Sequence, residues 1–180
     1  MDVMTRTPLA QTIATTATDI WNDSCAIDEL RYAIARGACG ATSNPSIVLE
    51  VLRKEAGRWL PRIREIAQAD PTLTEVDLTW AVIEEMAVRG AAELEPVFAR
   101  EGGRAGRLSL QTNPANHSNS ARMLEQGLRF AELAPNIQVK FPATRAGLVA
   151  IESATAAGIS INATVCFTLP QALAVCPACS

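Results

Sequence analysis

Five segments with strand-like patterns, each followed by a helical pattern, constrain the fold of this chain more than any other feature. The strand segments lie at residues 19–24, 39–46, 106–113, 136–142 and 159–167. Strands that alternate with helices form βα units, and these units build a parallel sheet. A length of 180 residues fits one domain. We therefore expect an α/β fold, with a lead-in over residues 1–18 and one domain over residues 19–180.

Small polar residues on one face of three of these strands favour a barrel over an open sheet. A doubly wound sheet, the alternative, is usually apolar on both faces. Neither GxGxxG nor GxxxxGK[ST] follows any of the five strands, so no nucleotide-binding loop supports that alternative. The interior of a barrel can be polar near its C-terminal mouth, where barrel enzymes carry out their chemistry. The prediction is a (β/α)8 TIM-barrel type fold with only about five of the eight βα units.

Local signals set the expected helix boundaries. Ser46 is expected to cap a helix over residues 47–55, and Thr144 a helix that begins at Arg145. Thr74 and Asp77 resemble a capping box. Between the second and third strands, the pattern predicts separate helices, which cover residues 59–69, 76–89 and 93–100.

Charge and hydropathy exclude several classes of protein. A net charge of −3 and a pI near 5.2 leave no basic footprint for nucleic acid. No apolar run approaches the roughly 18 residues that span a bilayer, and residues 1–10 lack the apolar core of a secretory signal. We expect a cytoplasmic protein with no nucleic-acid partner and no membrane partner.

The cysteines predict neither a disulfide framework nor a metal site. Their number, five, is odd. Three of them lie in apolar or strand-like contexts and are expected to be reduced, buried and inert: Cys25, Cys39 and Cys166. Cys176 and Cys179 form a CxxC, but zinc would need a second pair of ligands and the chain has one histidine, His117.

Lys140 lies in a strand with one apolar and one polar face, and Lys54 is the only other lysine. Ile137, Val139 and Phe141 alternate with Gln138, Lys140 and Pro142. Pro142 cannot donate to a strand ladder, so the strand should end there. Desolvation beside two apolar residues would favour the neutral amine, which is a nucleophile. The alternative, an edge-strand lysine that reaches water, is equally compatible with this strand alone.

Polar residues at the other strand ends are expected to face the same way as Lys140: Asp23, Asn44, Gln111, Asn162 and Thr164. An amine that forms a Schiff base with a ketose needs a carboxylate to move protons, and Asp23 is the candidate. It also needs amides and hydroxyls that hold a water and orient the substrate, which the other four can supply. Each has an ordinary alternative, such as Asp23 as a helix cap, and their joint placement favours a site. A serine hydrolase is disfavoured because His117 sits in a polar loop and no GxSxG elbow is present.

Three segments in this order resemble the transaldolase family. Ala41–Ser46 (ATSNPS) resembles the signature around its second strand. Val139–Thr144 (VKFPAT), with Ala146-Gly147-Leu148, resembles the segment of its Schiff-base lysine. Gly158–Thr164 (GISINAT) resembles its fifth strand. The resemblance covers residues from about 19 to 174.

The resemblance implies a class I (Schiff-base) aldolase barrel that needs no metal or organic cofactor. Such an enzyme moves a dihydroxyacetone unit from a ketose phosphate to an aldose phosphate. By motif position, Lys140 would be the Schiff-base lysine and Asp23 the proton-transfer carboxylate. Asn44 would contact the substrate, Thr164 would help to hold the catalytic water, and Asn162 would line the site.

The chain departs from the family in two respects. Transaldolases usually carry Glu on the third strand, where this chain has Gln111; the related fructose-6-phosphate aldolases also have Gln, so aldol cleavage is an alternative to transfer. The sixth to eighth strands, which in the family supply a Ser and Arg groups for the substrate phosphate, are not found. A five-stranded sheet exposes two edges. A second alternative is therefore a truncated, catalytically impaired fragment that only binds or associates, with a homo-oligomer as one way to pair its edges.

Overall fold

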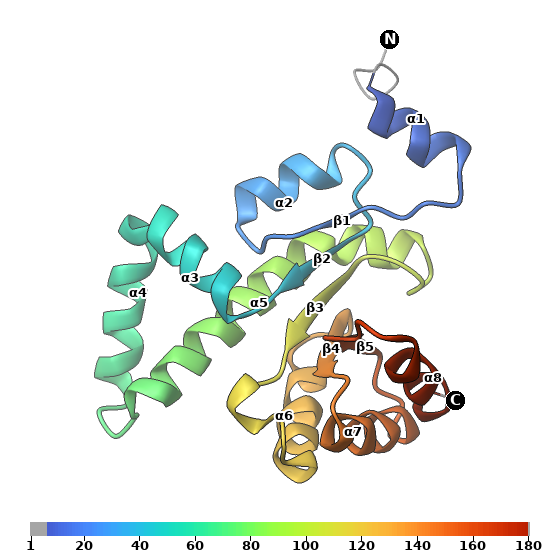
Figure 1. Ribbon diagram of the computed structural model, residues 1–180. Helices are drawn as coiled ribbons and strands as arrows, with labels where there is room; N and C mark the ends of the chain where they lie inside the picture. The colour runs from blue at the N-terminus through green and yellow to red at the C-terminus, as the bar shows by residue number, and fades with distance from the viewer. Residues whose placement is uncertain (1–6, 180) are drawn as a thin grey trace. The chain divides into compact units, whose positions relative to one another are not determined.

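The computed structural model describes residues 7–179 and has an α/β fold (Figure 1). Its five strands follow the chain order in the sheet, β1-β2-β3-β4-β5. The elements are α1 (Pro8–Thr15), β1 (Trp21–Asn22), α2 (Ile27–Ile34), β2 (Gly40–Ser43), α3 (Pro45–Lys54), α4 (Ala56–Ala69), α5 (Glu75–Arg100), β3 (Arg107–Gln111), η2 (Pro114–Asn116), α6 (Ser120–Leu133), β4 (Ile137–Pro142), α7 (Arg145–Ala156), β5 (Ile161–Thr164) and α8 (Leu169–Ala178). The predicted α/β fold, with five βα units of a (β/α)8 barrel, is confirmed. The chain divides into two compact units at Leu108 and Ser109.

In the first unit, β1 and β2 pair in parallel, with Trp21 opposite Gly40. A Cβ at Gly40 would lie 2.6 Å from two atoms of the Trp21 ring, so only glycine lets this ring lie across the neighbouring strand. Helices α2 and α5 pack together (Figure 1). Leu30 of α2 and Leu94 of α5 are fully buried, which gives this unit its own apolar core.

Helix α5 corrects one expectation, because residues 75–100 form a single helix where separate helices over 76–89 and 93–100 were predicted. Gly90 lies between the two predicted helices. In the structure it lies where a Cβ would meet Leu30 at 3.4 Å and Leu108 at 3.5 Å, so its small size serves close packing. That packing offsets the roughly 1 kcal/mol by which glycine disfavours a helix interior. The predicted capping box of Thr74 and Asp77 is confirmed at the start of the helix.

Two other predicted boundaries are wrong. Asn44, and not Ser46, caps α3: its side chain accepts a hydrogen bond from the Ile47 N–H at 2.9 Å. Pro45 then occupies the first helical position, where its missing N–H costs nothing. Strand β5 ends at Thr164, not at residue 167, because Val165 turns into the left-handed region with φ of 56°. The lead-in, predicted without an element, contains α1.

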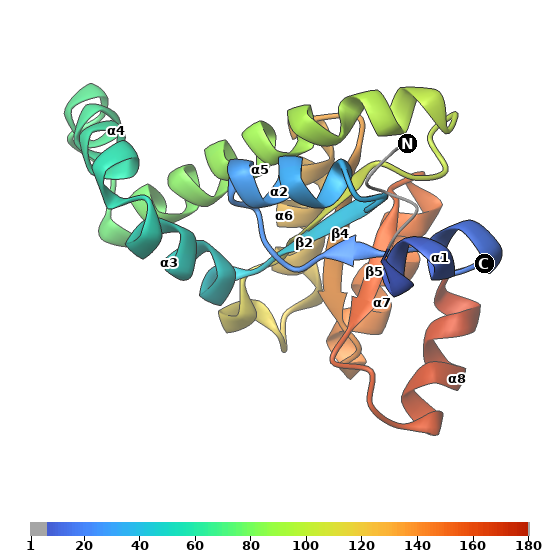
Figure 2. The same ribbon diagram turned by 90° about the horizontal axis from the view of Figure 1, so that it is seen from above.

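In the second unit, β4 and β5 pair in parallel (Figure 2), with Val139 opposite Ile161 and Phe141 opposite Ala163. Helix α6 packs on both β4 and α7. The side chains of Val139 and Phe141 are fully buried, as is Phe130 of α6. A Cβ at Gly127 of α6 would lie 2.5 Å from the Phe141 ring, so glycine lets this ring fill the space between helix and strand.

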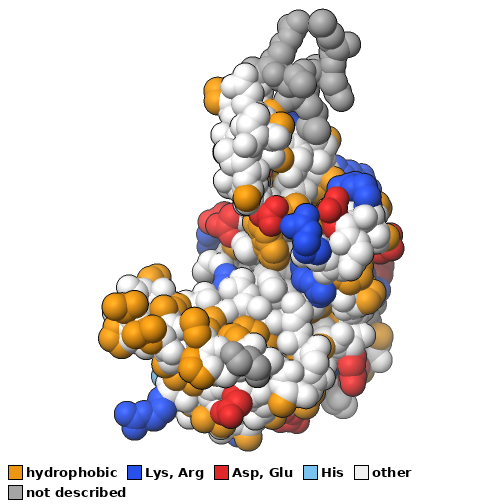
Figure 3. All heavy atoms as spheres, turned by 90° about the vertical axis from the view of Figure 1, so that its right-hand side faces the viewer, with side chains coloured by type: hydrophobic (Ala, Val, Ile, Leu, Met, Phe, Trp, Pro, Cys, Tyr) orange, Lys and Arg blue, Asp and Glu red, His pale blue; other side chains and the backbone are white. Residues whose placement is uncertain are grey.

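Apolar side chains are exposed around α8, on the face that Figure 3 shows. The exposed fractions are 84% for Phe167, 72% for Leu169 and 63% for Leu173. None of the α8 side chains described is buried. Helix α8 packs against α7, and its half-buried residues are Gln171, Val175 and Ala178.

The cysteine environments are only partly as predicted. Cys25 is buried, but Cys39 and Cys166 are half-buried, so the expectation of burial is wrong for these two. Burial raises the pKa of the Cys25 thiol to about 11, and it lies against Met86 Sδ at 3.2 Å. Cys176 and Cys179 are exposed, and none of the five cysteines is in a disulfide.

Alkylation should separate these thiols. At pH 8, iodoacetamide is expected to label Cys176 while Cys25 stays unmodified, since a pKa raised from 9.0 to about 11 lowers the thiolate fraction about a hundredfold. Peptide mass spectrometry measures both sites in one digest. The same sample in denaturant should label at both positions. Equal labelling of Cys25 and Cys176 in the folded protein would contradict the buried placement of Cys25.

Candidate active site

Lys140 lies on the polar face of β4, two residues before the strand ends at Pro142. It is half-buried, and its neighbours Val139 and Phe141 are fully buried, so the predicted alternation is confirmed. The Lys140 carbonyl accepts a hydrogen bond from the Thr112 N–H at 3.1 Å, which ties this part of β4 to the end of β3. Thr144 caps α7 as predicted, and its hydroxyl accepts from the Gly147 N–H at 3.0 Å.

Four of the predicted residues share one face of the second unit. Asn162 is the register partner of Lys140, and Thr164 is the partner of Pro142. Partners on parallel strands point to the same side, so Lys140, Asn162 and Thr164 face one way. The Asn162 amide donates to Ser109 Oγ at 3.0 Å. Gln111 stands two residues beyond Ser109 on β3 and therefore faces the same side.

The other two predicted residues, Asp23 and Asn44, belong to the first unit. The Thr42 hydroxyl donates a hydrogen bond to the Asp23 carboxylate, and Asp23 is exposed. The alternative role of Asp23 as a helix cap is wrong, because α2 begins after Ala26 without a side-chain cap. Asn44 is half-buried, and its side-chain amide oxygen Oδ1 caps α3.

Two residues that hold these side chains were not singled out from the sequence. Thr42 binds Asp23, and Ser109 binds Asn162. The alternation of both strands carried the signal: Thr42 stands two positions before Asn44, and Ser109 two positions before Gln111, each on the polar face. Each hydroxyl is thus hydrogen-bonded to the side chain of one predicted site residue.

His117, the one histidine of the chain, does not belong to this polar strand face. His117 is exposed, as predicted, and its carbonyl accepts from the Thr144 hydroxyl at 2.8 Å. Over residues 7–179, no cluster of three His, Cys, Asp or Glu side chains could hold a metal ion. Within the same range, no helix has both the length and the apolar character required to cross a membrane.

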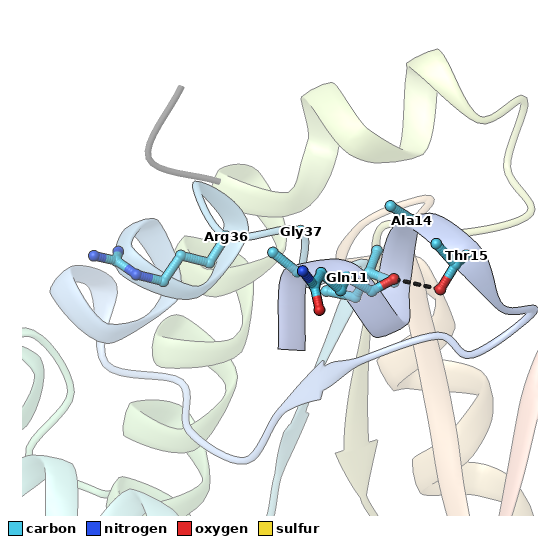
Figure 4. Close-up of a pocket in the computed structure, with 7 residues that line it drawn as sticks. Gln11, Ala14, Thr15, Arg36 and Gly37 are labelled. Atoms are coloured by element: carbon cyan, nitrogen blue, oxygen red, sulfur yellow. Dashed lines mark hydrogen bonds between the residues drawn. The ribbon is translucent and has the colours of Figure 1, made fainter. Parts of the chain in front are cut away.

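The cavity in Figure 4 has a volume of about 240 Å³ and lies between α1 and the end of α2. It is apolar, with Ile13 close to Gly37. The Arg36 side chain points away from α1 and stacks on the Tyr32 ring at 3.4 Å from its centroid. None of the predicted site residues lines this cavity, so it is not the candidate active site.

Comparison with known proteins supports the family resemblance of the sequence motifs. The family model described as Transaldolase/Fructose-6-phosphate aldolase matches residues 20–179. Transaldolases from Mycobacterium ulcerans and Mycobacterium tuberculosis are each 28% identical over 173 residues, which is 91% of this chain and 45% of the relative. Transaldolase 1 from Streptomyces avermitilis is 33% identical over 135 residues, which is 73% of this chain and 35% of the relative. The chain thus spans less than half the length of these relatives, and it belongs to the transaldolase/fructose-6-phosphate aldolase family.

Proposed function

We propose that the chain transfers a dihydroxyacetone unit between sugar phosphates through a Schiff base on Lys140. One observation carries the proposal: Lys140 lies on a polar strand face with Gln111, Asn162 and Thr164, near the C-terminal end of its strand. This is the end at which barrel enzymes hold their substrates. Family membership supports the same chemistry.

The proposed reaction begins when the Lys140 amine attacks the ketose carbonyl carbon. The resulting carbinolamine loses water to form an imine. Asp23 then accepts the proton of the C4 hydroxyl as the C3–C4 bond breaks, so the aldehyde leaves and the dihydroxyacetone carbons stay on the lysine as an enamine. Attack of the enamine on a second aldehyde forms the new carbon–carbon bond, and the aldehyde oxygen takes the proton back from Asp23. Water then hydrolyses the resulting imine, which releases the new ketose phosphate and regenerates the Lys140 amine. Thr164 and Gln111 would hold the water that enters and leaves.

Gln111 favours a second candidate, aldol cleavage of fructose 6-phosphate. A glutamine can orient a water but cannot accept its proton, whereas the transaldolases usually have a carboxylate at this position. In cleavage, the enamine is protonated and the imine is hydrolysed, which releases dihydroxyacetone. Both candidates use the same lysine and the same first steps.

Product analysis with fructose 6-phosphate tests the proposal and separates the candidates. Transfer predicts a new ketose phosphate that forms only when an aldose phosphate acceptor is added. Cleavage predicts free dihydroxyacetone without any acceptor. A folded sample that gives neither product would contradict both candidates and leave a chain that only binds or associates, whose state gel filtration would then report.

A further inference from the structure

Gln171, the third residue of α8, makes five side-chain hydrogen bonds that connect three segments of the second unit. Its oxygen accepts from the Phe167 N–H at 3.0 Å, the Thr168 N–H at 3.1 Å and the Thr168 hydroxyl at 3.1 Å. Its NH₂ group donates to the Val165 carbonyl at 3.0 Å and the Ala143 carbonyl at 3.2 Å. The oxygen forms the capping box of α8 with Thr168, a role that Glu fills equally well. Only the NH₂ group reaches Ala143, the residue that directly follows β4.

The two donor bonds act at the ends of β4 and β5. Ala143 directly follows Pro142, and its N–H donates to the Thr164 carbonyl at 2.7 Å. The carbonyl of the same residue is bound by Gln171, so both polar groups of Ala143 are tied to the segment that leaves β5. The segment that follows the Lys140 strand is therefore connected to the end of β5 in two ways. The Ala143 N–H binds the Thr164 carbonyl, and the Gln171 side chain binds the carbonyls of both Ala143 and Val165.

The hydrogen bond from Gln171 also constrains the backbone of Val165. Its φ of 56° is an unfavourable backbone conformation for a β-branched residue. Its side chain is 48% exposed, so burial does not compensate. A strained residue persists only where its surroundings fix it, and the hydrogen bond from Gln171 to the Val165 carbonyl does so. If this hydrogen bond is lost, the backbone at Val165 is expected to relax and to displace Thr164, the preceding residue.

We propose that Gln171 is a positioning residue that holds the end of β5 against the end of β4 and so fixes Thr164 relative to Lys140. Its consequence for catalysis rests on the proposed Schiff-base function. The amide oxygen of Gln171 caps α8, and its NH₂ group fixes the geometry of the candidate active site.

Gln171→Glu separates these two roles, because a carboxylate keeps the capping box and loses both donor bonds. Ala172→Glu is the matched control: it adds the same charge at an exposed neighbouring position of α8. Both variants should retain the helical circular dichroism of the wild type. In Gln171→Glu, the Ala143 amide should exchange with solvent roughly tenfold faster or more, since two hydrogen bonds are lost. Toward a pH of about 4 the introduced carboxyl protonates and can donate one bond, so its difference from the control should shrink.

Borohydride trapping of fructose 6-phosphate provides the catalytic readout. We expect Gln171→Glu to trap the sugar about tenfold more slowly at saturation, with an unchanged half-saturating concentration, and Ala172→Glu to behave as the wild type. Equal exchange of the Ala143 amide in the two variants would overturn the proposal, whether or not the wild type traps sugar. Faster exchange with unchanged trapping would overturn the positioning role. A wild type that traps nothing would reject the proposed function, while amide exchange would still decide whether Gln171 fastens the two strands.

Discussion

Lys140→Met is expected to abolish the covalent sugar adduct and to lower turnover of sugar phosphate by roughly a thousandfold or more. Methionine keeps the length and the apolar stem of lysine but has no amine, so neither carbinolamine nor imine can form. The half-buried position between two fully buried residues should accept it without a change in fold. Product formation with fructose 6-phosphate measures the effect, and circular dichroism checks the fold.

Lys54→Met is the matched control for this variant. Lys54 is exposed at the end of α3, and its ammonium group forms an ion pair with Glu29 at 3.0 Å. An exposed pair of this kind contributes at most about 1 kcal/mol to stability, so the control should keep both the fold and the activity. Activity that survives in Lys140→Met, or is lost equally in Lys54→Met, would remove Lys140 from the proposed role.

Gly147→Ala is expected to destabilise the second unit by about 3 kcal/mol or more. A Cβ at this position would lie 1.8 Å from the Pro142 carbonyl oxygen, which is a backbone atom and cannot rotate away. The first turn of α7 would have to leave the end of β4, and the cap that Thr144 provides through the Gly147 N–H would be strained with it. The same displacement would disturb the strand end that follows Lys140.

Urea unfolding followed by far-UV circular dichroism measures this loss. Tryptophan fluorescence alone would not serve, because all three tryptophans (Trp21, Trp59 and Trp80) lie in the first unit. Gly57→Ala in α4 is the control. Apart from its chain neighbours and the nearby backbone of its own helix, no heavy atom lies within 4 Å of its Cβ position, so it should change stability by less than about 1 kcal/mol. A Gly147→Ala protein as stable as this control would show that α7 does not approach β4 as closely as the structure has it.

Much of the fold could be predicted because its signals are local. The period-two alternation around Lys140 fixed which side chains of β4 are buried, and Thr144 marked the start of α7 by its cap. The limits of α5 and β5 could not be predicted in the same way. Gly90 acts through contacts with Leu30 and Leu108, which are distant in sequence. The end of β5 depends on a strained Val165 that no propensity predicts.

In the candidate site, too, the local pattern could be predicted and the contacts between distant residues could not. Alternation placed Lys140, Asn162 and Thr164 on one face, and register pairing agrees with it. The supporting groups escaped notice because their partners are far away in sequence: Ser109 meets Asn162 across 53 positions, and Gln171 meets Ala143 across 28. The capping-box pattern predicts the hydrogen bonds that the Gln171 oxygen accepts. The bonds that its NH₂ group donates follow only from the folded geometry. The catalytic roles themselves stay predictions until chemistry tests them.

Borohydride reduction in the presence of fructose 6-phosphate, followed by peptide mass spectrometry, tests the central claim most directly. The proposal predicts a stable dihydroxyacetone or hexose phosphate adduct on the peptide that contains Lys140 and none on the peptide that contains Lys54. The two lysines make the assignment unambiguous, because the chain has no others. A folded sample without any adduct, or with equal modification of both lysines, would contradict a Schiff base on Lys140.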